Sequence, residues 1–268
     1  MSQDAFACLL DDLAAETASV VDLLAALPEA DWELPTPAEG WSIRDQVSHL
    51  AFFDEQAVLA VAAPSRFRDG AQALMAGGMD FPDRIALRYR EMPVAELRAW
   101  FQVARERLVS VFGGLEGSTR VPWFGPDMSL MSSATARLME TWAHGMDIAD
   151  TLGRSVEATP RLKHIAHLGV RTHGFSFAVR GLEVPRTAVR VELDAPDGTT
   201  WAWGPVDAAD KVTGPALDFC LVVTQRRHRL DTELDIAGDA ARSWMSHAQA
   251  FAGAPSDGRA PRPVGAHT

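Results

Sequence analysis

The sequence predicts a mainly α-helical protein in which a four-helix bundle precedes a small α+β domain. Apolar residues recur at helical spacing in long stretches up to about Gly153, and strand-like alternation begins only near residue 189. The pair Asp197-Gly198 lies between two strand-like runs, where it favours a hairpin turn. We therefore expect a bundle over residues 1–155, an α+β domain over 156–252 and a disordered tail over 253–268.

Composition and charge are those of an ordinary globular protein. Hydrophobic residues make up 47% of the 268 residues and charged residues 23%, which is enough for a sizeable core. The formal net charge is -11, and such a surface repels phosphate backbones and anionic lipids. We expect no nucleic-acid partner and no membrane partner. Because the two cysteines are far apart and neither a signal peptide nor a membrane span is recognisable, we expect a cytoplasmic protein.

Four segments with helical periodicity form the predicted bundle, and prolines or glycines separate them. Pro28 follows the first helix, and Ser42 is a good N-cap for the second. Pro93 divides the third helical region into two pieces. A Gly- and Ala-rich segment after the second helix is expected to be a mobile excursion. The expected ranges are 4–27, 43–62, 81–112 and 129–152 for the helices and 64–80 for the excursion.

The second domain is expected to combine helices with short strands. Residues 189–194 alternate apolar and polar side chains, and a strand returns after the Asp-Gly turn. Asp239 is the expected N-cap of the last helix. The expected ranges are 160–181, 216–226 and 239–251 for helices and 189–194, 199–203, 211–213 and 234–236 for strands.

A carboxylate and an imidazole lie one turn apart in the fourth predicted helix of the bundle. Glu140 and His144 share a helix face and can bind the same ion, so they form a plausible half of a metal site. His49 lies near the edge of the apolar stripe of the second helix. If it faces the pair, three protein ligands leave at least one coordination position open, which suits catalysis or ligand binding. Alternatively, His49 is a partly buried histidine that a carboxylate satisfies.

The stretch from Trp41 to Leu50, followed by Glu140-x-x-x-His144-Gly-x-Asp147, resembles the DinB-like metal-binding superfamily. Within it, the chain looks like the mycothiol-dependent maleylpyruvate isomerase branch of actinobacteria, which also has a small sterol-carrier-like C-terminal domain. The resemblance covers most of the chain. It implies that His49, Glu140 and His144 hold a divalent metal, usually Zn²⁺, with Ni²⁺, Mn²⁺ or Fe²⁺ as alternatives. It also implies mycothiol as co-substrate.

This resemblance implies an enzyme whose metal binds a low-molecular-weight thiol. The metal would depress the pKa of the sulfur, and the thiolate would attack a small electrophilic substrate, for which an anionic group is one option. The outcome would be S-transfer or an addition–elimination isomerisation. A non-catalytic metal- or ligand-binding protein and a metal-assisted hydrolase remain alternatives. The expected partners are small molecules only, and the expected assembly is a monomer or a homodimer.

Two pairs of residues are candidates for the surroundings of the metal. Asp45 lies one turn before His49, and Asp147 lies one turn after His144, so either could orient an imidazole or be an exposed carboxylate. Trp123 and Phe124 stand in a proline-containing loop before the fourth predicted helix of the bundle. This loop is expected either to bound a substrate pocket or to be a packed connection.

The segment from Gln225 to Arg229 is the dense basic cluster of this acidic chain. It could be a solvated helix end, where cations complement the helix dipole. The resemblance implies instead that an arginine of the C-terminal domain helps to bind the thiol or the substrate. Arg226 and Arg227 are both candidates, because a guanidinium suits a carboxylate.

Overall fold

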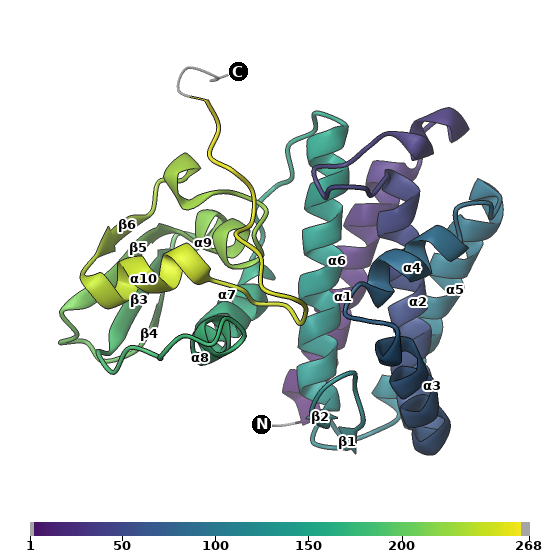
Figure 1. Ribbon diagram of the computed structural model, residues 1–268, viewed down its shortest axis with the longest axis horizontal. Helices are drawn as coiled ribbons and strands as arrows, with labels where there is room; N and C mark the ends of the chain where they lie inside the picture. Colours follow the sequence, from purple (N-terminus) through teal and green to yellow (C-terminus); the bar gives the residue numbers. More distant parts are fainter. Residues whose placement is uncertain (1–2, 264–268) are drawn as a thin grey trace. The chain divides into compact units, whose positions relative to one another are not determined.

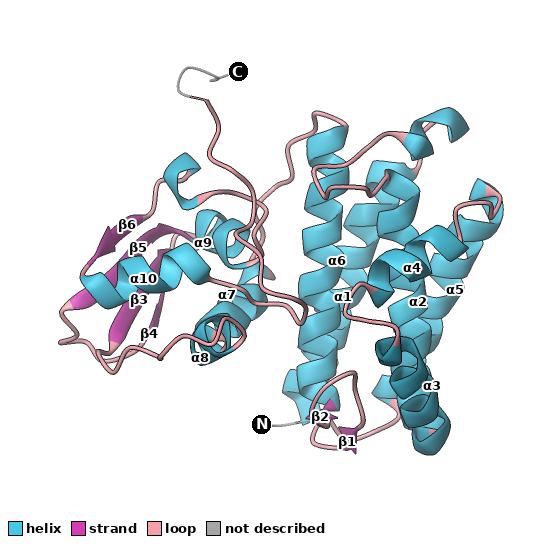
Figure 2. Ribbon diagram, viewed as in Figure 1, coloured by secondary structure: helices cyan, strands magenta, loops and turns pink. Residues whose placement is uncertain are grey.

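The chain folds into two units, the first ending at Val156 and the second beginning at Glu157. The computed structural model describes residues 3–263 (Figure 1). Long helices make up most of the first unit, together with the short paired strands β1 (Arg120–Val121) and β2 (Met128–Ser129). The second unit contains a four-stranded sheet with helices (Figure 2). This architecture confirms the predicted fold class, a helical bundle followed by a small α+β domain.

Four long helices form the bundle of the first unit. They are α1 (Gln3–Leu24), α2 (Ile43–Ala62), α5 (Val94–Gly113) and α6 (Leu130–Thr151), with the short helix η1 (Glu29–Glu33) between α1 and α2. α1 packs against α6, and α2 packs against both α5 and α6. Apolar residues at steps of three and four bury one face of each helix, as Val47 and Leu50 do on α2. Burial of each leucine-sized side chain contributes roughly 1.5–3 kcal/mol.

Side-chain caps fix where the two site-bearing helices begin. At the start of α2, Ser42 and Asp45 form a capping box, in which the backbone N–H of Ser42 donates to Asp45 Oδ2 at 2.9 Å. At the start of α6, the backbone N–H of Ser132 donates to Ser129 Oγ at 3.1 Å. Because each helix begins at a fixed residue, the direction of every later side chain is also fixed.

The expectation of a mobile excursion over residues 64–80 is wrong. Most of this segment is helix α3 (Pro64–Ala76), which is followed by α4 (Phe81–Arg88). Phe67 and Ala71 lie one turn apart on α3 and are buried, and Phe67 stacks on Trp123 with ring centres 5.7 Å apart. The small residues of this segment obscured a spacing that gives the helix an apolar face.

A buried ion pair links the four bundle helices. Arg105 Nε on α5 lies 2.7 Å from Asp54 Oδ2 on α2, and neither side chain is more than 4% exposed. The same guanidinium donates to the hydroxyls of Thr17 on α1 and Thr141 on α6. Burying a charge is costly unless the charge is paired and hydrogen-bonded. One arginine therefore holds all four helices in register.

The second unit is built around a sheet with the strand order β4-β3-β5-β6. Its elements are α7 (Leu162–Arg171), α8 (His173–Ala178), β3 (Val189–Asp194), β4 (Thr200–Trp203), β5 (Asp210–Pro215), α9 (Ala216–Val223), η2 (Arg229–Asp231), β6 (Asp235–Ala237) and α10 (Asp239–His247). β3 and β4 form an antiparallel hairpin, and β3 and β5 are parallel. In the predicted turn between β3 and β4, Gly198 has a φ of 79°. The helix predicted over 160–181 is interrupted at Thr172.

The start of α10 differs from the prediction. Asp239 is the first helical residue rather than the cap, and Gly238 precedes it with a φ of 90°. Asp210 of β5 takes the capping role, because its Oδ2 accepts hydrogen bonds from the backbone N–H groups of Ala240 and Ala241 at 2.7 and 3.2 Å. A carboxylate at this position complements the positive end of the helix dipole.

The predicted disordered tail, residues 253–268, is described up to residue 263. In this part the backbone N–H of Arg262 donates to Asp231 at 2.9 Å, and Ser256 Oγ donates to Gln225 Oε1 at 2.5 Å. The described part is therefore hydrogen-bonded to the rest of the second unit. Residues 264–268 lie outside the described residues, so the prediction for them stays a prediction.

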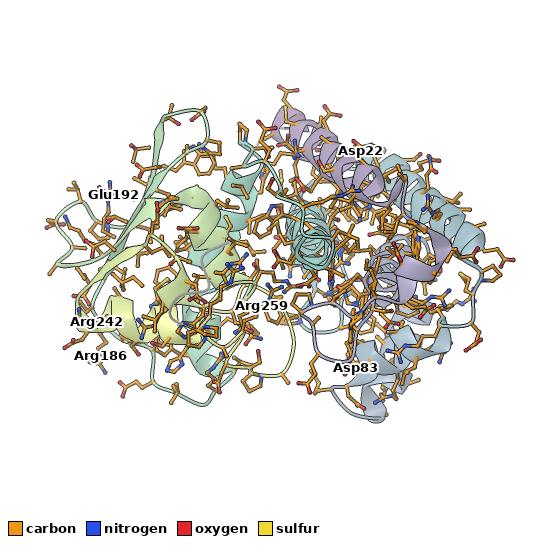
Figure 3. All side chains as sticks on the ribbon, turned by 90° about the horizontal axis from the view of Figure 1, so that it is seen from above. Asp22, Asp83, Arg186, Glu192, Arg242 and Arg259 are labelled. Carbon is orange, nitrogen blue, oxygen red and sulfur yellow. The ribbon has the colours of Figure 1, made fainter. Side chains whose placement is uncertain are left out.

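Charged side chains such as Asp22, Asp83 and Arg242 are exposed and point outward from their helices (Figure 3). Between residues 3 and 263, no helix is both long enough and apolar enough to cross a membrane.

Replacing Asp54 by alanine is expected to destabilise the first unit by about 3–5 kcal/mol, because Arg105 would remain buried without its counter-ion. Urea unfolding followed by circular dichroism measures this change. Asp80→Ala is the control, since it removes only the exposed ion pair with Arg84 on α4. If Asp54→Ala were no more destabilising than the control, the buried pair would not hold the bundle.

Candidate metal centre

The bundle brings the three predicted metal ligands to one point. His49 lies on α2, Glu140 and His144 lie on α6, and one ligand atom from each lies within 4.8 Å of the others. Glu140 Oε2 is 3.1 Å from His144 Nε2 and 3.5 Å from His49 Nε2. Over residues 3–263, no second group of at least three histidine, cysteine or carboxylate side chains has this spacing. The side chains are 8–17% exposed, and Glu140 is the most exposed of the three.

Gln46 on α2 fixes the tautomer of His144. His144 Nδ1 donates to Gln46 Oε1, and Gln46 Nε2 donates in turn to Thr36 Oγ1 at 2.7 Å. The Thr36 hydroxyl donates to the backbone oxygen of Trp41 at 2.8 Å, which sets the orientation of the amide. With its proton on Nδ1, His144 presents a lone pair on Nε2 to Glu140. His144 Nε2 and Glu140 Oε2 repel each other unless a proton or a cation lies between them. All three side chains can coordinate one cation at this position.

Burial and neighbouring charges set the protonation states of the group. Burial, assisted by repulsion from His144, lowers the pKa of His49 to about 4. Burial alone would raise the pKa of Glu140. When the nitrogen of His144 or His49 that faces it carries a proton, the hydrogen bond that this nitrogen donates, together with the charge of Arg137, holds the pKa well below its usual range. At neutral pH, His49 is therefore a neutral imidazole and Glu140 a carboxylate, which are the forms that bind metals.

Aromatic rings cover one side of the three side chains. The Trp41 ring stacks on His144 with centres 5.8 Å apart and lies 5.2 Å from the ring of His49. Its Nε1 donates to Asp83 on α4 at 2.7 Å, which fixes the indole. Phe53, one turn after His49, lies 4.5 Å from the imidazole. These rings limit the access of water, and electrostatic interactions among the polar atoms are stronger as a result.

The predicted loop residues Trp123 and Phe124 lie one ring further away. Their ring centres are 6.3 and 5.4 Å from that of Phe53, which itself touches His49. Both also contact Phe67 of α3. The loop is thus a packed connection at the outer side of the aromatic cluster, and its role in bounding a substrate pocket stays a prediction.

A buried arginine beside these rings was not predicted. Arg137 lies one turn before Glu140 on α6 and is 4% exposed. Its Cζ lies 5.4 Å from the ring centre of Trp123 and 5.7 Å from that of Phe53. Within residues 3–263, no group accepts a hydrogen bond from its buried Nε or Nη1. Burial lowers the pKa of Arg137, although the charges of Glu140 and Asp54 oppose this effect.

The two aspartates predicted to orient the histidines have different surroundings. Asp45 caps α2 and pairs with Arg90, whose Nη2 lies 2.9 Å from Asp45 Oδ2. Its carboxylate bonds Ser42 and Arg90, and His49 Nδ1 has no hydrogen-bond partner among residues 3–263, so Asp45 does not orient His49. Asp147 is buried on α6, one turn beyond His144, and its orienting role stays a prediction.

The predicted arginines Arg226 and Arg227 follow α9 in the second unit. α9 ends earlier than predicted, and Gln225 adopts a φ of 60° just beyond it. The backbone N–H of Arg226 donates to the oxygen of Leu221 at 2.8 Å, and that of Gln225 donates to the oxygen of Val222 at 3.0 Å. This is the Schellman pattern of a helix end, in which glycine usually takes the left-handed position.

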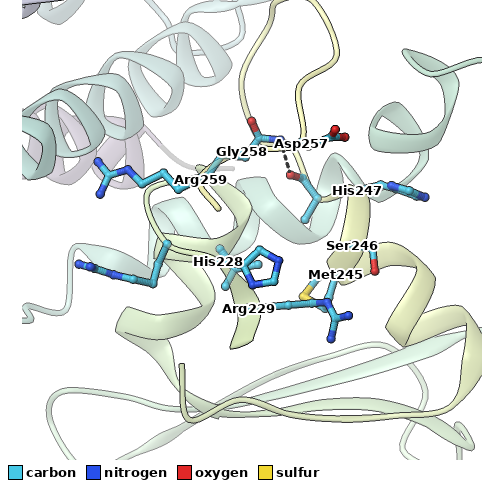
Figure 4. Close-up of a pocket in the computed structure, with 12 residues that line it drawn as sticks. His228, Arg229, Met245, Ser246, His247, Asp257, Gly258 and Arg259 are labelled. Atoms are coloured by element: carbon cyan, nitrogen blue, oxygen red, sulfur yellow. Dashed lines mark hydrogen bonds between the residues drawn. The ribbon is translucent and has the colours of Figure 1, made fainter. Parts of the chain in front are cut away.

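Arg227 lines a cavity of about 270 Å³ within the second unit (Figure 4). Arg229, Arg259 and His228 also line it, so basic groups predominate around it. Arg226 Nη1 donates to the backbone oxygen of Thr224 at 2.8 Å. The lining suits an anionic group, and the role of either predicted arginine in binding thiol or substrate stays a prediction.

Sequence reasoning missed Gln46 and Arg137 and gave Trp41 no role at the site. Helical spacing held a signal for Arg137, which is three residues before Glu140 and seven before His144 and so shares their helix face. Gln46 is a polar residue on the fully buried side of α2, but no spacing rule distinguishes such a glutamine from an exposed one.

Sequence comparisons place the metal-ligand candidates within a known family description. Residues 13–149 match the protein family described as "Mycothiol maleylpyruvate isomerase N-terminal domain". Residues 185–232 match the family described as "Wyosine base formation". The uncharacterised proteins Rv0036c and MT0041, from two strains of Mycobacterium tuberculosis, are each 46% identical to this chain over 248 residues. The matched region covers 92% of this chain and 96% of each relative.

Two solved structures share the fold. They are crystal structures of the mycothiol-dependent maleylpyruvate isomerase and of a histidine-to-alanine mutant of it, with TM-scores of 0.57 and 0.56. Each alignment covers 84% of this chain and 90% of the solved chain, at 14% sequence identity. At this identity the likeness concerns the fold alone.

Proposed function

Because the chain belongs to the mycothiol maleylpyruvate isomerase family, we propose that it is a divalent-metal-dependent enzyme that uses a low-molecular-weight thiol. The proposed thiol is mycothiol, and the proposed reaction is S-transfer to, or isomerisation of, a small electrophilic substrate. The family is the one that the sequence motifs indicated. The convergence of His49, Glu140 and His144 is the observation that carries the proposal.

The donor set fits a divalent metal. Two imidazole nitrogens and one carboxylate oxygen are suitable ligands for Zn²⁺, and Ni²⁺, Mn²⁺ and Fe²⁺ accept the same types. Gln46 orients the free lone pair of His144 Nε2 toward Glu140, as hydrogen-bond partners of metal-binding histidines do. Three protein ligands would leave room for an exogenous ligand, which is typical of catalytic rather than structural sites.

A divalent metal bound here would lower the pKa of a coordinated thiol. The protein's own residues supply the surroundings. His49 is neutral at physiological pH and needs no deprotonation before it binds, because its pKa is about 4. Trp41 and Phe53 restrict water on one side of the donors. The pair Arg105–Asp54 holds α2 and α6 in register, so the donors need little rearrangement.

We also propose that Arg226 or Arg227 holds an anionic group of the thiol or the substrate. The basic lining of the cavity beside Arg227 supports this assignment. A guanidinium binds a carboxylate through two parallel hydrogen bonds and so fixes its orientation as well as its position.

Replacing His49 or His144 by alanine is expected to remove most of the bound metal, because each variant loses one of three donors. Metal analysis of the purified proteins measures the metal content. His164→Ala is the matched control, since this histidine lies on α7 outside the group. Full metal occupancy in both site variants would contradict the ligand assignment.

Gln46→Leu is expected to weaken metal binding by about 10–100-fold while leaving all three donors in place, because His144 would lose the acceptor for its Nδ1 proton. Competition with a chromophoric chelator measures the affinity. Gln102→Leu on α5 is the control, because Gln102 is exposed. Unchanged affinity in Gln46→Leu would show that the glutamine does not orient the ligand.

Thiol addition to the cobalt-substituted protein is expected to produce a sulfur-to-metal charge-transfer band, because the proposed function requires the thiol to bind at the metal. Mycothiol is the probe, and its S-methyl derivative, which lacks an ionisable thiol, is the control. Absence of the band at saturating thiol would contradict thiol chemistry and favour a hydrolase or a binding protein. The same titration of Arg226→Ala and Arg227→Ala tests the arginine assignment through the thiol affinity, with cobalt content unchanged.

A further inference from the structure

The cavity in the second unit lies between three segments that are far apart in the sequence. Its lining comes from the end of α9 and the turn after it, from the end of α10 and from the C-terminal segment (Figure 4). The lining residues fall within 222–229, 245–248 and 257–259. All of them belong to the second unit, so the cavity is complete without any residue of the metal centre. A volume of about 270 Å³ suits a small organic molecule.

Gln225 holds these three segments together. Its φ of 60° is a left-handed conformation that is unfavourable for a residue with a side chain. Its Nε2 donates to the backbone oxygens of Ala248 and Ser256 at 3.1 and 3.0 Å, and its Oε1 accepts from Ser256 Oγ at 2.5 Å. Unfavourable backbone conformations that the surroundings enforce are concentrated at functional sites. We therefore interpret the cavity as a preformed site rather than a gap in the packing.

Positive charge predominates around the cavity. Arg227, Arg229 and Arg259 line it, and Asp257 is the one acidic residue among the lining residues. Over the second unit as a whole, acidic residues balance lysines and arginines. The excess of positive charge is therefore local to the cavity, where it favours an anionic ligand.

His228 and Arg229 supply hydrogen-bond donors to this lining. The backbone N–H of Leu230 donates to His228 Nδ1 at 3.2 Å, so the neutral imidazole carries its proton on Nε2. The guanidinium of Arg229 makes no ion pair or hydrogen bond within residues 3–263. Both side chains line the cavity and can donate to an anion that enters it.

The rest of the lining includes apolar side chains. Val222, Met245 and Ala248 also line the cavity, and each is no more than 4% exposed. Apolar surface beside a cluster of donors suits a molecule with an anionic group and a small apolar body.

We propose that this cavity binds a phosphate monoester of a small organic molecule. At neutral pH a phosphate monoester carries close to two negative charges and offers three acceptor oxygens. Three arginines against one aspartate match such a dianion, whereas one guanidinium fork is enough for a carboxylate. Arg227 is shared with the site proposed above for the thiol or the substrate. The two ligands would therefore compete only if Arg227, and not Arg226, holds that anionic group.

The test is a calorimetric titration of the full-length protein with phenyl phosphate, which joins the phosphate to a small apolar body. The wild type is expected to bind it at least about tenfold more tightly than benzoate and to show no binding of uncharged benzyl alcohol. Arg229→Met is expected to lower the affinity for phenyl phosphate at least about tenfold, the scale of a charged hydrogen bond. Arg186→Met, an exposed arginine of the same unit outside the lining, is the matched control and is expected to bind as the wild type does.

Gln225→Gly tests whether the cavity is a preformed site. Glycine adopts a positive φ freely, so the end of α9 is expected to fold as before while the hydrogen bonds to Ala248 and Ser256 are lost. The affinity for phenyl phosphate is expected to fall several-fold with an unchanged circular dichroism spectrum. Wild-type affinity in this variant would count against the assignment. If Arg229→Met does not fold, Arg229→Lys keeps the charge without the fork and is also expected to bind phenyl phosphate more weakly than the wild type.

A metal at the bundle site could also bind a phosphate, so the wild type is titrated before and after treatment with a chelator. Equal affinity in both titrations is expected, because no metal-ligand candidate lines the cavity. If the metal proposal alone fails, the protein contains no metal, yet its affinity for phenyl phosphate still depends on Arg229. The assignment would be overturned by a wild type that does not bind phenyl phosphate, by wild-type affinity in folded Arg229→Met, or by loss of binding on removal of the metal.

Discussion

The buried ion pair between Arg105 and Asp54 is the interaction on which the candidate site depends. Asp54 lies on the helix of His49, and the Thr141 hydroxyl that receives a hydrogen bond from Arg105 belongs to the residue after Glu140. The guanidinium therefore fixes the two donor-bearing helices relative to each other. Apolar packing tolerates small displacements, whereas a charge buried without its partner is strongly unfavourable. The hydrogen-bond geometry of one side chain thus sets the position of groups on both helices.

Much of the fold and part of the site could be predicted from the sequence, because helical spacing decides which side chains share a face. Glu140 and His144 are four residues apart, and their meeting with His49 followed from the bundle and the family motifs. The hydrogen-bond partner of His144 could not be predicted in this way. Gln46 reaches it only because Thr36, in the loop before α2, turns the amide, and no local pattern encodes a contact between a loop and two helices.

Errors in the sequence reasoning have a common physical origin. Residues 64–76 are rich in small side chains, so their composition suggested mobility, while Phe67 supplied the buried anchor of a helix. Asp239 satisfied the rule for an N-cap, but Asp210 on a neighbouring strand occupies the position in space. In both cases a contact between residues far apart in the sequence determined the local structure. Patterns of neighbouring residues do not reveal such contacts.

The stacking of Trp123 on Phe67 has a consequence for how this family can diversify. The donors stand on the long helices of the bundle, whereas the outer aromatic wall comes from a loop and from α3. Under the proposed function, substitutions in these peripheral segments are expected to change which molecules reach the donors without disturbing the register of the donor-bearing helices. In an enzyme built on this plan, substrate selectivity and reactivity would reside in separate segments, so that selection could alter the first while the second is kept.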